Sequence, residues 1–285
     1  MPELPEVEVL KRSLSKNIKS KKIIKIKINN PNLRYKIPKN LSKYLKNKVV
    51  KNILRISKYL IIDFGVNKKK LLIHLGMSGT IHLVKKNNKF NTNASFYSHL
   101  DLPTKHNHVE IFLNNNLKLI YNDPRRFGFF KFLDEYFMIN NLGPDPFNKE
   151  FNYNYIKNYI KNKKKNLKIL LMDQKFVSGI GNIYANEIIF NCKINPTKNI
   201  SKLTSKNIYD IIKNTKKVLK KAIYLGGSSI QNFSKTNGEL GNFQQEFMVY
   251  GRNNKKCLRN NCKGILKKVT ISNRSTFFCP ICQIN

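Results

Sequence analysis

The sequence predicts an α+β protein of more than one domain, with an antiparallel β domain first, a helical domain next and a cysteine-rich finger last. Three observations support this prediction. Short apolar or alternating segments dominate residues 23–135, and helical periodicity dominates the chain after residue 150. Four of the five cysteines lie after residue 256. A chain of 285 residues is long enough for about two domains.

A helix is predicted over residues 3–20, where apolar side chains recur at the spacing of one helical face: Val7, Leu10, Leu14 and Ile18. Eight short segments then have the length and pattern of β-strands. These segments are Ile23–Ile28, Val49–Ile56, Tyr59–Phe64, Leu71–Leu75, Thr80–Val84, Val109–Leu113, Leu117–Tyr121 and Gly128–Leu133. A hairpin is expected around Asn114–Asn116, and the polar stretch 86–107 is expected to be a long loop. Seven or eight such strands favour an antiparallel sandwich or barrel.

Two prolines and a glycine in Asn141–Phe147 mark the linker between the domains, which we place at residues 136–150. We expect a β domain at residues 1–135 and a helical domain at residues 151–246. The finger follows at residues 247–285.

Helices are predicted over residues 166–173, from Asn182 onward and over residues 205–224. Asn182 follows Gly179-Ile-Gly181 and is expected to cap its helix. A loop rich in Gly, Ser and Asn is expected at residues 226–243.

The chain carries a formal net charge of +38 and has a pI of about 10.1, which points to a polyanionic partner such as nucleic acid. Lys, Asn and Ile are abundant throughout and Trp is absent, so biased composition explains part of this charge. No apolar run approaches the roughly 18–20 residues of a membrane span, and the first residues are acidic rather than basic. We therefore expect a cytoplasmic protein without a membrane partner.

The four late cysteines are spaced Cys257-x4-Cys262-x16-Cys279-x2-Cys282. Two such pairs on successive turns place four thiolates in a tetrahedron, which suits one structural Zn²⁺. Chance clustering of buried thiols is the alternative. Arg274 lies between the pairs, near an expected hairpin tip, either as a phosphate contact or as a solvated cation. Cys192 is expected to be a small buried hydrophobic residue.

The N-terminus offers a second chemical group. Removal of Met1 exposes the secondary amine of Pro2, which can attack an electrophilic carbon and form an iminium. Glu3 and Glu6 follow directly and can supply acid and base groups. The alternative is that these residues merely begin a helix, where proline and acidic side chains are favoured.

A resemblance decides between these alternatives. The opening MPELPEVE and the late cysteines resemble the formamidopyrimidine-DNA glycosylase family, and further motifs of that family recur in order along nearly the whole chain. These are Arg55-Ile-Ser-Lys58-Tyr-Leu, His74-Leu-Gly-Met77-Ser-Gly, Asn122-Asp-Pro-Arg125-Arg126-Phe127-Gly, Met172-Asp-Gln-Lys175, Gly179-Ile-Gly181-Asn182-Ile-Tyr184-Ala, Gly226-Gly-Ser-Ser and Val249-Tyr250-Gly-Arg252.

The resemblance implies a β-sandwich with an N-terminal helix, a helix-two-turn-helix domain and a β-hairpin zinc finger. It implies a base-excision repair enzyme that removes oxidised purines through an iminium at Pro2 and cuts the abasic strand by β,δ-elimination. The implied catalytic set is Pro2, Glu3, Lys58 and Arg274, with Glu6 contacting the lesion.

The resemblance also implies the DNA contacts. Met77, Arg125 and Phe127 would fill the space that the extruded base leaves. Phosphates would be held by Lys58, His74, Asn182, Tyr250 and Arg274. Lys168 would lie near the lesion, and the loop 226–243 would cover the flipped base. Without the resemblance, core packing for Met77 and Phe127, an ion pair for Arg125 and a satisfied histidine for His74 are the alternatives.

One feature departs from the family pattern. The first cysteine pair is spaced x4, where the family usually has x2, and this changes the expected reach of Arg274. Two other functions stay open. One is an endonuclease VIII-like glycosylase for oxidised pyrimidines, and the other is a non-catalytic zinc-ribbon protein that binds nucleic acid. The expected partner is damaged double-stranded DNA, bound by a nucleoid-associated monomer without a small-molecule cofactor.

Overall fold

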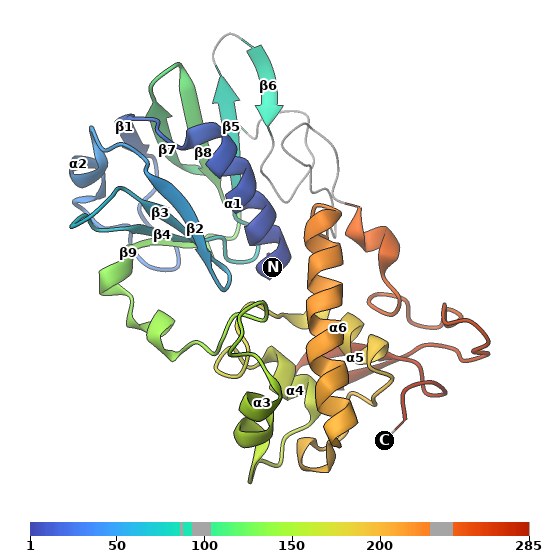
Figure 1. Cartoon of the computed structure of the whole chain (residues 1–285). Coiled ribbons are helices and arrows are strands. Elements are labelled where there is room, and N and C mark those ends of the chain that lie inside the picture. Colours follow the sequence, from blue (N-terminus) through green and yellow to red (C-terminus); the bar gives the residue numbers. More distant parts are fainter. Residues whose placement is uncertain (86–87, 93–103, 229–241, 285) are drawn as a thin grey trace. The chain divides into compact units, whose positions relative to one another are not determined.

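The structure is a computed structural model that describes residues 1–85, 88–92, 104–228 and 242–284 (Figure 1). It forms two compact units. The first unit contains Met1–Asn140 and Ile223–Gln244, and the second contains Asn141–Ala222 and Gln245–Asn285. The domain limits expected from the sequence stay predictions. No helix among the described residues is both long enough and apolar enough to span a membrane.

The first unit is built mainly from β-strands. Its helices are α1 (Leu4–Ile18) and α2 (Leu41–Leu45), with 3₁₀ turns at η1 (Leu133–Glu135) and η2 (Phe137–Asn141), the last of which reaches the start of the second unit. The strands are β1 (Ile23–Ile28), β2 (Asn52–Ile56), β3 (Tyr59–Asp63), β4 (Leu71–His74), β5 (Thr80–Lys85), β6 (Asn88–Thr92), β7 (Asn107–Leu113), β8 (Leu117–Asn122) and β9 (Phe129–Phe132).

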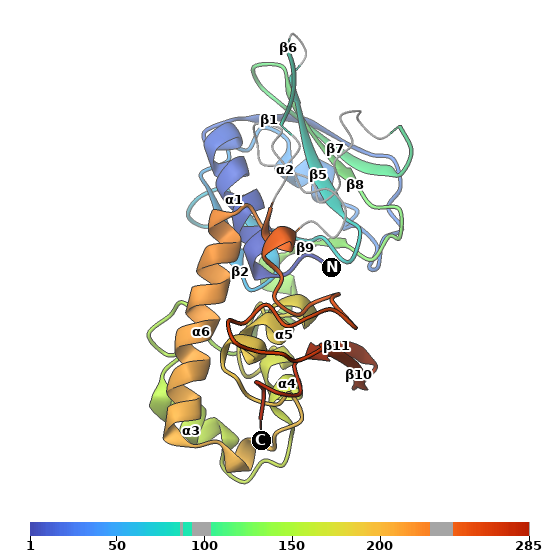
Figure 2. The same cartoon turned by 90° about the vertical axis from the view of Figure 1, so that its right-hand side faces the viewer.

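These strands form two antiparallel sheets, ordered β1-β7-β8-β5-β6 and β2-β3-β4-β9. Figure 2 shows β5, β7 and β8 of the first sheet side by side. One apolar core contains Ile62 and Ile73 from one sheet and Ile111 from the other. The same core includes the face of α1 that helical spacing predicted, and all four of its apolar residues are at most 2% exposed. The predicted sandwich with an N-terminal helix is confirmed.

Two hairpin turns of the first unit are tight and have a defined backbone conformation. The β7–β8 turn uses Asn115 and Asn116 at φ +60° and +56°, a left-handed backbone that asparagine tolerates, so the hairpin predicted there is confirmed. The β2–β3 hairpin pairs Ile56 with Tyr59, which leaves a turn of only two residues, Ser57 and Lys58.

The expectation of one long loop at 86–107 was wrong. Strand β6 lies within this stretch at Asn88–Thr92, and β7 begins at Asn107. Strand β6 is the edge of its sheet, and an edge strand needs hydrogen bonds to one neighbour only, so its polar sequence carries little strand signal. Residues 93–103 of the expected loop lie outside the described residues.

The second unit is helical and ends in a β-hairpin. Its helices are α3 (Tyr153–Ile160), α4 (Leu167–Met172), α5 (Asn182–Asn191) and α6 (Ser205–Tyr224), with 3₁₀ turns η3 (Ile200–Lys202) and η4 (Phe243–Glu246). The hairpin strands are β10 (Lys267–Ile271) and β11 (Arg274–Phe278). The last two residues of α6 and the start of η4 belong to the first unit. The sequence pattern missed α3, although Asn152 caps it by accepting the Tyr155 amide at 3.0 Å.

Candidate active site, phosphate contacts and metal centre

The start of α1 gathers the proposed nucleophile and two acids. Pro2 is buried, and Glu3 and Glu6 are only 3% and 1% exposed. The Glu3 backbone N–H donates to Glu6 Oε2 at 2.8 Å. Burial lowers the pKa of the Met1 amino group; Glu3 and Glu6 oppose this, and the charges of Lys58 and Arg125 add to it. This environment favours the unprotonated, nucleophilic form of an amine.

Glu6 also fixes a segment 222 positions further along the chain. Its Oε1 accepts hydrogen bonds from the backbone N–H of Ser228 at 2.8 Å and from the Ser228 hydroxyl at 3.0 Å. The preceding Gly227 has φ +86°, and a Cβ there would lie 3.1 Å from Glu6 Oε1. The predicted loop at 226–243 therefore starts from a fixed point, but its residues 229–241 lie outside the described residues.

Lys58 lies at the tip of the β2–β3 hairpin. The two-residue turn has Ser57 at φ +54°, and Lys58 is only 7% exposed. Its charge lowers the pKa of both the Met1 amine and His74. The turn therefore places a buried cation within electrostatic reach of the amino terminus and of the neighbouring histidine.

His74 ends β4 and is uncharged at neutral pH. Burial lowers its pKa to about 4, and the charges of Lys58 and Arg34 contribute. Its Nδ1 lies 3.1 Å from the Gly76 N–H and accepts a hydrogen bond from it. The neutral ring therefore carries its proton on Nε2, which leaves one N–H donor for a partner such as phosphate.

The turn after β8 presents Arg125 and Phe127 at the surface. Phe127 is 43% exposed, and the guanidinium carbon of Arg125 lies 4.6 Å from the centre of its ring. Met77, on the β4–β5 loop, is half-buried. A Cβ on Gly76 would lie 2.4 Å from the Phe127 carbonyl carbon, so glycine is needed for the two loops to meet.

Asp123 holds this turn in place, and the sequence analysis did not identify it. The side chain is fully buried and accepts hydrogen bonds from the Ser78 hydroxyl, from Tyr121 Oη at 3.0 Å and from the Gly128 N–H at 2.8 Å. Ser78 Oγ in turn accepts from the Arg125 N–H at 3.2 Å. Arg125 and Phe127 are therefore presented from a rigid base.

In the second unit, Asn182 and Lys168 both bind the finger. Asn182 Nδ2 donates to the Ser275 carbonyl at 3.1 Å, and Lys168 Nζ donates to the same carbonyl at 2.9 Å and to Thr276 Oγ1 at 2.6 Å. Lys168 is 1% exposed. Both side chains thus fix the strand that begins at Arg274, which is exposed directly after the Ser272–Asn273 turn.

Asn182 is not the cap that the sequence predicted. Gly181 occupies the N-cap of α5, and Asn182 is the first helical residue. The reason is that the side chain of Asn182 is engaged by the finger instead of by its own helix.

Glu187 on α5 fixes Tyr250, and sequence reasoning missed it. Its carboxylate accepts the backbone N–H groups of Met248, Val249 and Tyr250 at 2.9–3.0 Å. Burial raises the pKa of Glu187, and these three amides oppose the rise. Tyr250 also packs edge-on against Phe277 of the finger, with ring centres 5.4 Å apart. The sequence offered one indication of this role, a single acidic residue in a largely apolar helix. It could not show the partners, because they lie about sixty residues further along the chain.

The four late cysteines come together as predicted. Their sulfur atoms all lie within 4.8 Å of one another, with Cys257–Cys282 at 3.8 Å and Cys262–Cys279 at 3.6 Å. A tetrahedral site with metal–sulfur bonds of about 2.3 Å has sulfur–sulfur edges of about 3.8 Å. The cluster therefore fits a tetrahedral metal ion.

The longer first knuckle is fastened to α5 by Arg259. Its Nη2 donates to the Phe190 carbonyl at 2.7 Å, and its guanidinium carbon lies 4.6 Å from the centre of the Phe190 ring. The x4 knuckle thus carries a side chain that binds a last-turn carbonyl of the helix that begins at Asn182.

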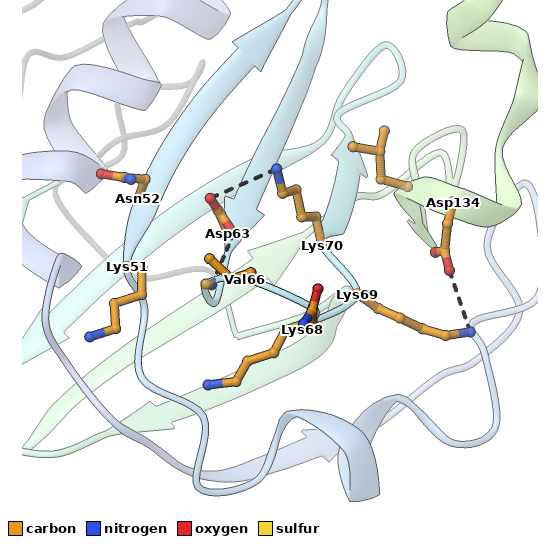
Figure 3. A pocket seen from close by; sticks show the side chains of 11 residues that line it. Lys51, Asn52, Asp63, Val66, Lys68, Lys69, Lys70 and Asp134 are labelled. Atoms are coloured by element: carbon orange, nitrogen blue, oxygen red, sulfur yellow. Dashed lines mark hydrogen bonds and ion pairs between the residues drawn. The ribbon is translucent and has the colours of Figure 1, made fainter.

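Two surface hollows of similar size are lined by described residues of the first unit. The larger, of about 690 Å³, is lined by lysines and acids (Figure 3). It lies at the Asn52–Asp63 end of the hairpin, opposite the Lys58 tip, and Lys69 and Lys70 are paired there with acids. It therefore holds none of the predicted catalytic residues. The second, of about 630 Å³, is lined by Arg34, Arg125, Arg126 and Phe127 with Asn32 and Leu33, a set that suits an anionic backbone.

Comparison with known proteins assigns these features to a family. Residues 1–130 match the formamidopyrimidine-DNA glycosylase N-terminal domain, and residues 142–234 match the H2TH domain of the same family. A formamidopyrimidine-DNA glycosylase of Haemophilus influenzae (strain PittEE) is 39% identical over 99% of both chains. One of Legionella pneumophila (strain Lens) is 36% identical over 99% of this chain and 98% of the relative. The chain belongs to the formamidopyrimidine-DNA glycosylase family.

Solved structures of DNA complexes show the same fold as this chain. The complex of Lactococcus lactis Fpg with DNA containing an abasic site superposes with a TM-score of 0.84, at 33% identity and 99% coverage of both chains. MutM in complex with DNA containing carbocyclic 8-oxo-G gives the same score, identity and coverage. The predicted fold class, its helix-two-turn-helix domain included, and the predicted enzyme class, a DNA glycosylase, are confirmed.

We expect the buried neutral His74 to make stability depend on pH. Its pKa is about 4 when folded and about 6.5 when unfolded, so between these values only the unfolded chain binds the proton. Stability from this group is therefore lost as the pH falls below 6.5. Urea unfolding should show the unmodified chain losing about 2 kcal/mol more than His74→Asn between pH 7 and pH 5. Parallel pH dependences of the two proteins would contradict the assignment.

Proposed function

We propose that this glycosylase removes oxidised purines, such as 8-oxoguanine and formamidopyrimidines, from double-stranded DNA and then cleaves the abasic strand. The observation that carries the proposal is the start of α1, where Pro2 lies beside buried Glu3 and Glu6 while the charge of Lys58 acts on the amino terminus. The names of the relatives, and structures of the Lactococcus lactis protein with Fapy-dG and abasic-site DNA, support the substrate class.

The first chemical step needs a free proline. Removal of Met1 converts the Pro2 nitrogen from an amide into a secondary amine with a lone pair. That lone pair attacks C1′ of the flipped nucleotide, and the bond from C1′ to the base breaks, with its electron pair leaving on the base, which takes up a proton. The new ammonium then loses its proton, and the recovered nitrogen lone pair forms the iminium as the C1′–O4′ bond breaks and Glu3 supplies a proton to O4′.

The iminium makes strand cleavage possible because it withdraws electrons from C2′. Loss of a C2′ proton expels the 3′ phosphate in a β-elimination, and a second elimination expels the 5′ phosphate. Lys58, which is buried and acts electrostatically on the amino terminus, stabilises negative charge at the sugar and its phosphate. Neither elimination needs a small-molecule cofactor, because the nucleophile belongs to the chain itself.

Base extrusion leaves a hole that this chain can fill. A target atom inside the stack is inaccessible, so the nucleotide must leave the duplex. We propose that exposed Phe127 wedges the stack, that Arg125 donates to the orphaned base and that Met77 occupies vacated space. We also propose that Glu6 contacts the lesion, since it already holds Ser228 near the start of the loop 226–243.

Phosphate contacts complete the proposal. We assign them to Lys58, His74, Asn182, Tyr250 and Arg274, with His74 acting as a neutral donor. Lys168 is bonded to the strand that begins at Arg274, and this supports a role in holding Arg274 in reach of the DNA near the lesion. We propose a nucleoid-associated cytoplasmic monomer as the working form.

We further propose that the four-cysteine cluster holds one Zn²⁺. Thiolates are the ligands that zinc prefers in closed tetrahedral sites, and the sulfur spacing suits such a site. The ion would hold the finger that carries Arg274 and take no part in the chemistry.

Duplexes with single lesions test the substrate class. With the Met1-processed chain, we expect excision of 8-oxoguanine opposite cytosine, β,δ-cleaved ends on gel electrophoresis and little cutting of an undamaged duplex. Pro2→Gly should bind the duplex but not cut it, because a primary amine on glycine lacks the proline ring that positions the lone pair. Faster cutting of a thymine glycol duplex than of the 8-oxoguanine duplex would favour the endonuclease VIII-like alternative.

Metal analysis tests the finger. Cys262→Ser removes one of four thiolates, and we expect its purified form to retain little zinc and to bind duplex DNA more weakly. Cys192→Ser is the matched control, because Cys192 lies outside the cluster and donates to the Asp210 carbonyl, which serine can also do. Equal zinc contents in the two variants would refute the assignment of these ligands.

A further inference from the structure

Arg55 joins α1 to the hairpin that carries Lys58. Its Nε donates to Glu8 Oε2 at 2.9 Å, and its Nη1 donates to the Ser57 carbonyl at 3.1 Å. The side chains of Arg55 and Glu8 are only 9% and 11% exposed. One guanidinium therefore fixes both the second turn of the helix and the residue immediately before Lys58.

The turn that Arg55 binds has a backbone conformation that needs stabilising contacts. Ser57 has φ +54°, in the left-handed region that non-glycine residues enter at a cost. The turn has only two residues, so the orientation of the Ser57 carbonyl and the path into Lys58 are coupled. A hydrogen bond to that carbonyl from a planar, forked donor restricts both.

Glu8 is a fixed charge at the other end of this link. Burial would raise its pKa, but hydrogen bonds from Arg12 and Arg55 outweigh burial and hold the pKa below its usual range. Arg12 Nε donates to Glu8 Oε1 at 2.9 Å, yet its side chain is 63% exposed. Glu8 thus has two arginine partners, and Arg55 is the one that also donates to the Ser57 carbonyl of the hairpin turn.

We propose that Arg55 is a positioning residue for the iminium chemistry, which holds Lys58 beside the amino terminus by tying the Ser57–Lys58 turn to α1. The inference rests on the proposed function, because it concerns the amine that carries out the attack. Arg55 itself contacts neither the amine nor the sugar in this scheme.

The consequence is electrostatic. Lys58 and Arg125 disfavour protonation of the Met1 amine, whereas Glu3 and Glu6 favour it, and we expect the same four charges to act on the adjacent Pro2 nitrogen once Met1 is removed. A loosened turn would move Lys58 away and leave the other three charges in place. The amine would then hold its proton to higher pH, and attack would need more alkaline conditions.

The test is the pH dependence of borohydride trapping on a duplex with one abasic site, using the full-length, Met1-processed, metal-loaded protein. We expect Arg55→Met and Lys58→Met to shift the midpoint of the rate upward by roughly half a pH unit, which is about a threefold slower rate on the acid limb. The double variant should shift no further than Lys58→Met alone, because both changes act through the same ammonium.

Two further variants separate positioning from mere folding. Arg12→Met removes the other arginine that binds Glu8, a residue of α1 whose side chain is 63% exposed, and should leave the midpoint unchanged. Arg55→Lys keeps a cation opposite Glu8, so it protects the fold if Arg55→Met does not fold, but it lacks the forked donor and should still shift the midpoint.

A normal midpoint in the folded Arg55 variants, with lower thermal stability alone, would overturn the inference and leave Arg55 as a structural ion pair. A normal midpoint in Lys58→Met would overturn it as well. These results differ from failure of the proposed function itself, in which the unmodified sequence would give no trapped complex at any pH.

Discussion

This structure depends most on buried carboxylates that accept hydrogen bonds from backbone amides of turns and connecting segments, in two cases far along the chain. Glu6 holds Ser228, Asp123 holds Gly128, and Glu187 holds the three amides of residues 248–250. A buried carboxylate is costly unless its oxygens are satisfied, so each of them tolerates only arrangements that bring its donors to it. The chain has 16 acidic residues against 54 basic ones, and it uses three of those acids inside to fix the segments that present its candidate site.

Each unit uses such hydrogen-bonded carboxylates to hold its own part of the candidate site. In the first, α1 holds the amine and two acids, the β2–β3 turn adds Lys58, and the Asp123 turn presents Arg125 and Phe127. In the second, α5 is the common reference: Asn182 binds the finger strand, Glu187 binds the segment of Tyr250, and its last turn receives Arg259 from the lengthened knuckle. The exposed side chains that would contact a charged, deformable ligand are thus attached to segments that are already fixed. This limits the conformational entropy that is lost on binding.

The elements that periodicity and turn chemistry govern were predictable. The limits of β1 and of α6 match the sequence pattern, the Asn115–Asn116 turn lies where expected, and the cysteine spacing indicated the metal cluster. Contacts between remote segments were not predictable from one sequence. Nothing in the local pattern shows that Glu187 binds residue 250, that Asp123 supports a turn or that Lys168 is bonded to the finger. Strand β6 was missed because an edge strand needs no apolar pattern, and Asn182 was misassigned as a cap because its partner lies on another element.

The central claim is that the nitrogen of Pro2 forms the bond to the sugar. The most direct test is peptide mass mapping of the borohydride-reduced complex with an abasic-site duplex. The account predicts that the added mass lies on the amino-terminal peptide, that this peptide begins at Pro2 with Met1 removed, and that fragmentation places the sugar remnant on the proline nitrogen. A sugar remnant on Lys58 or on any other lysine, or an adduct on a peptide that retains Met1, would contradict it.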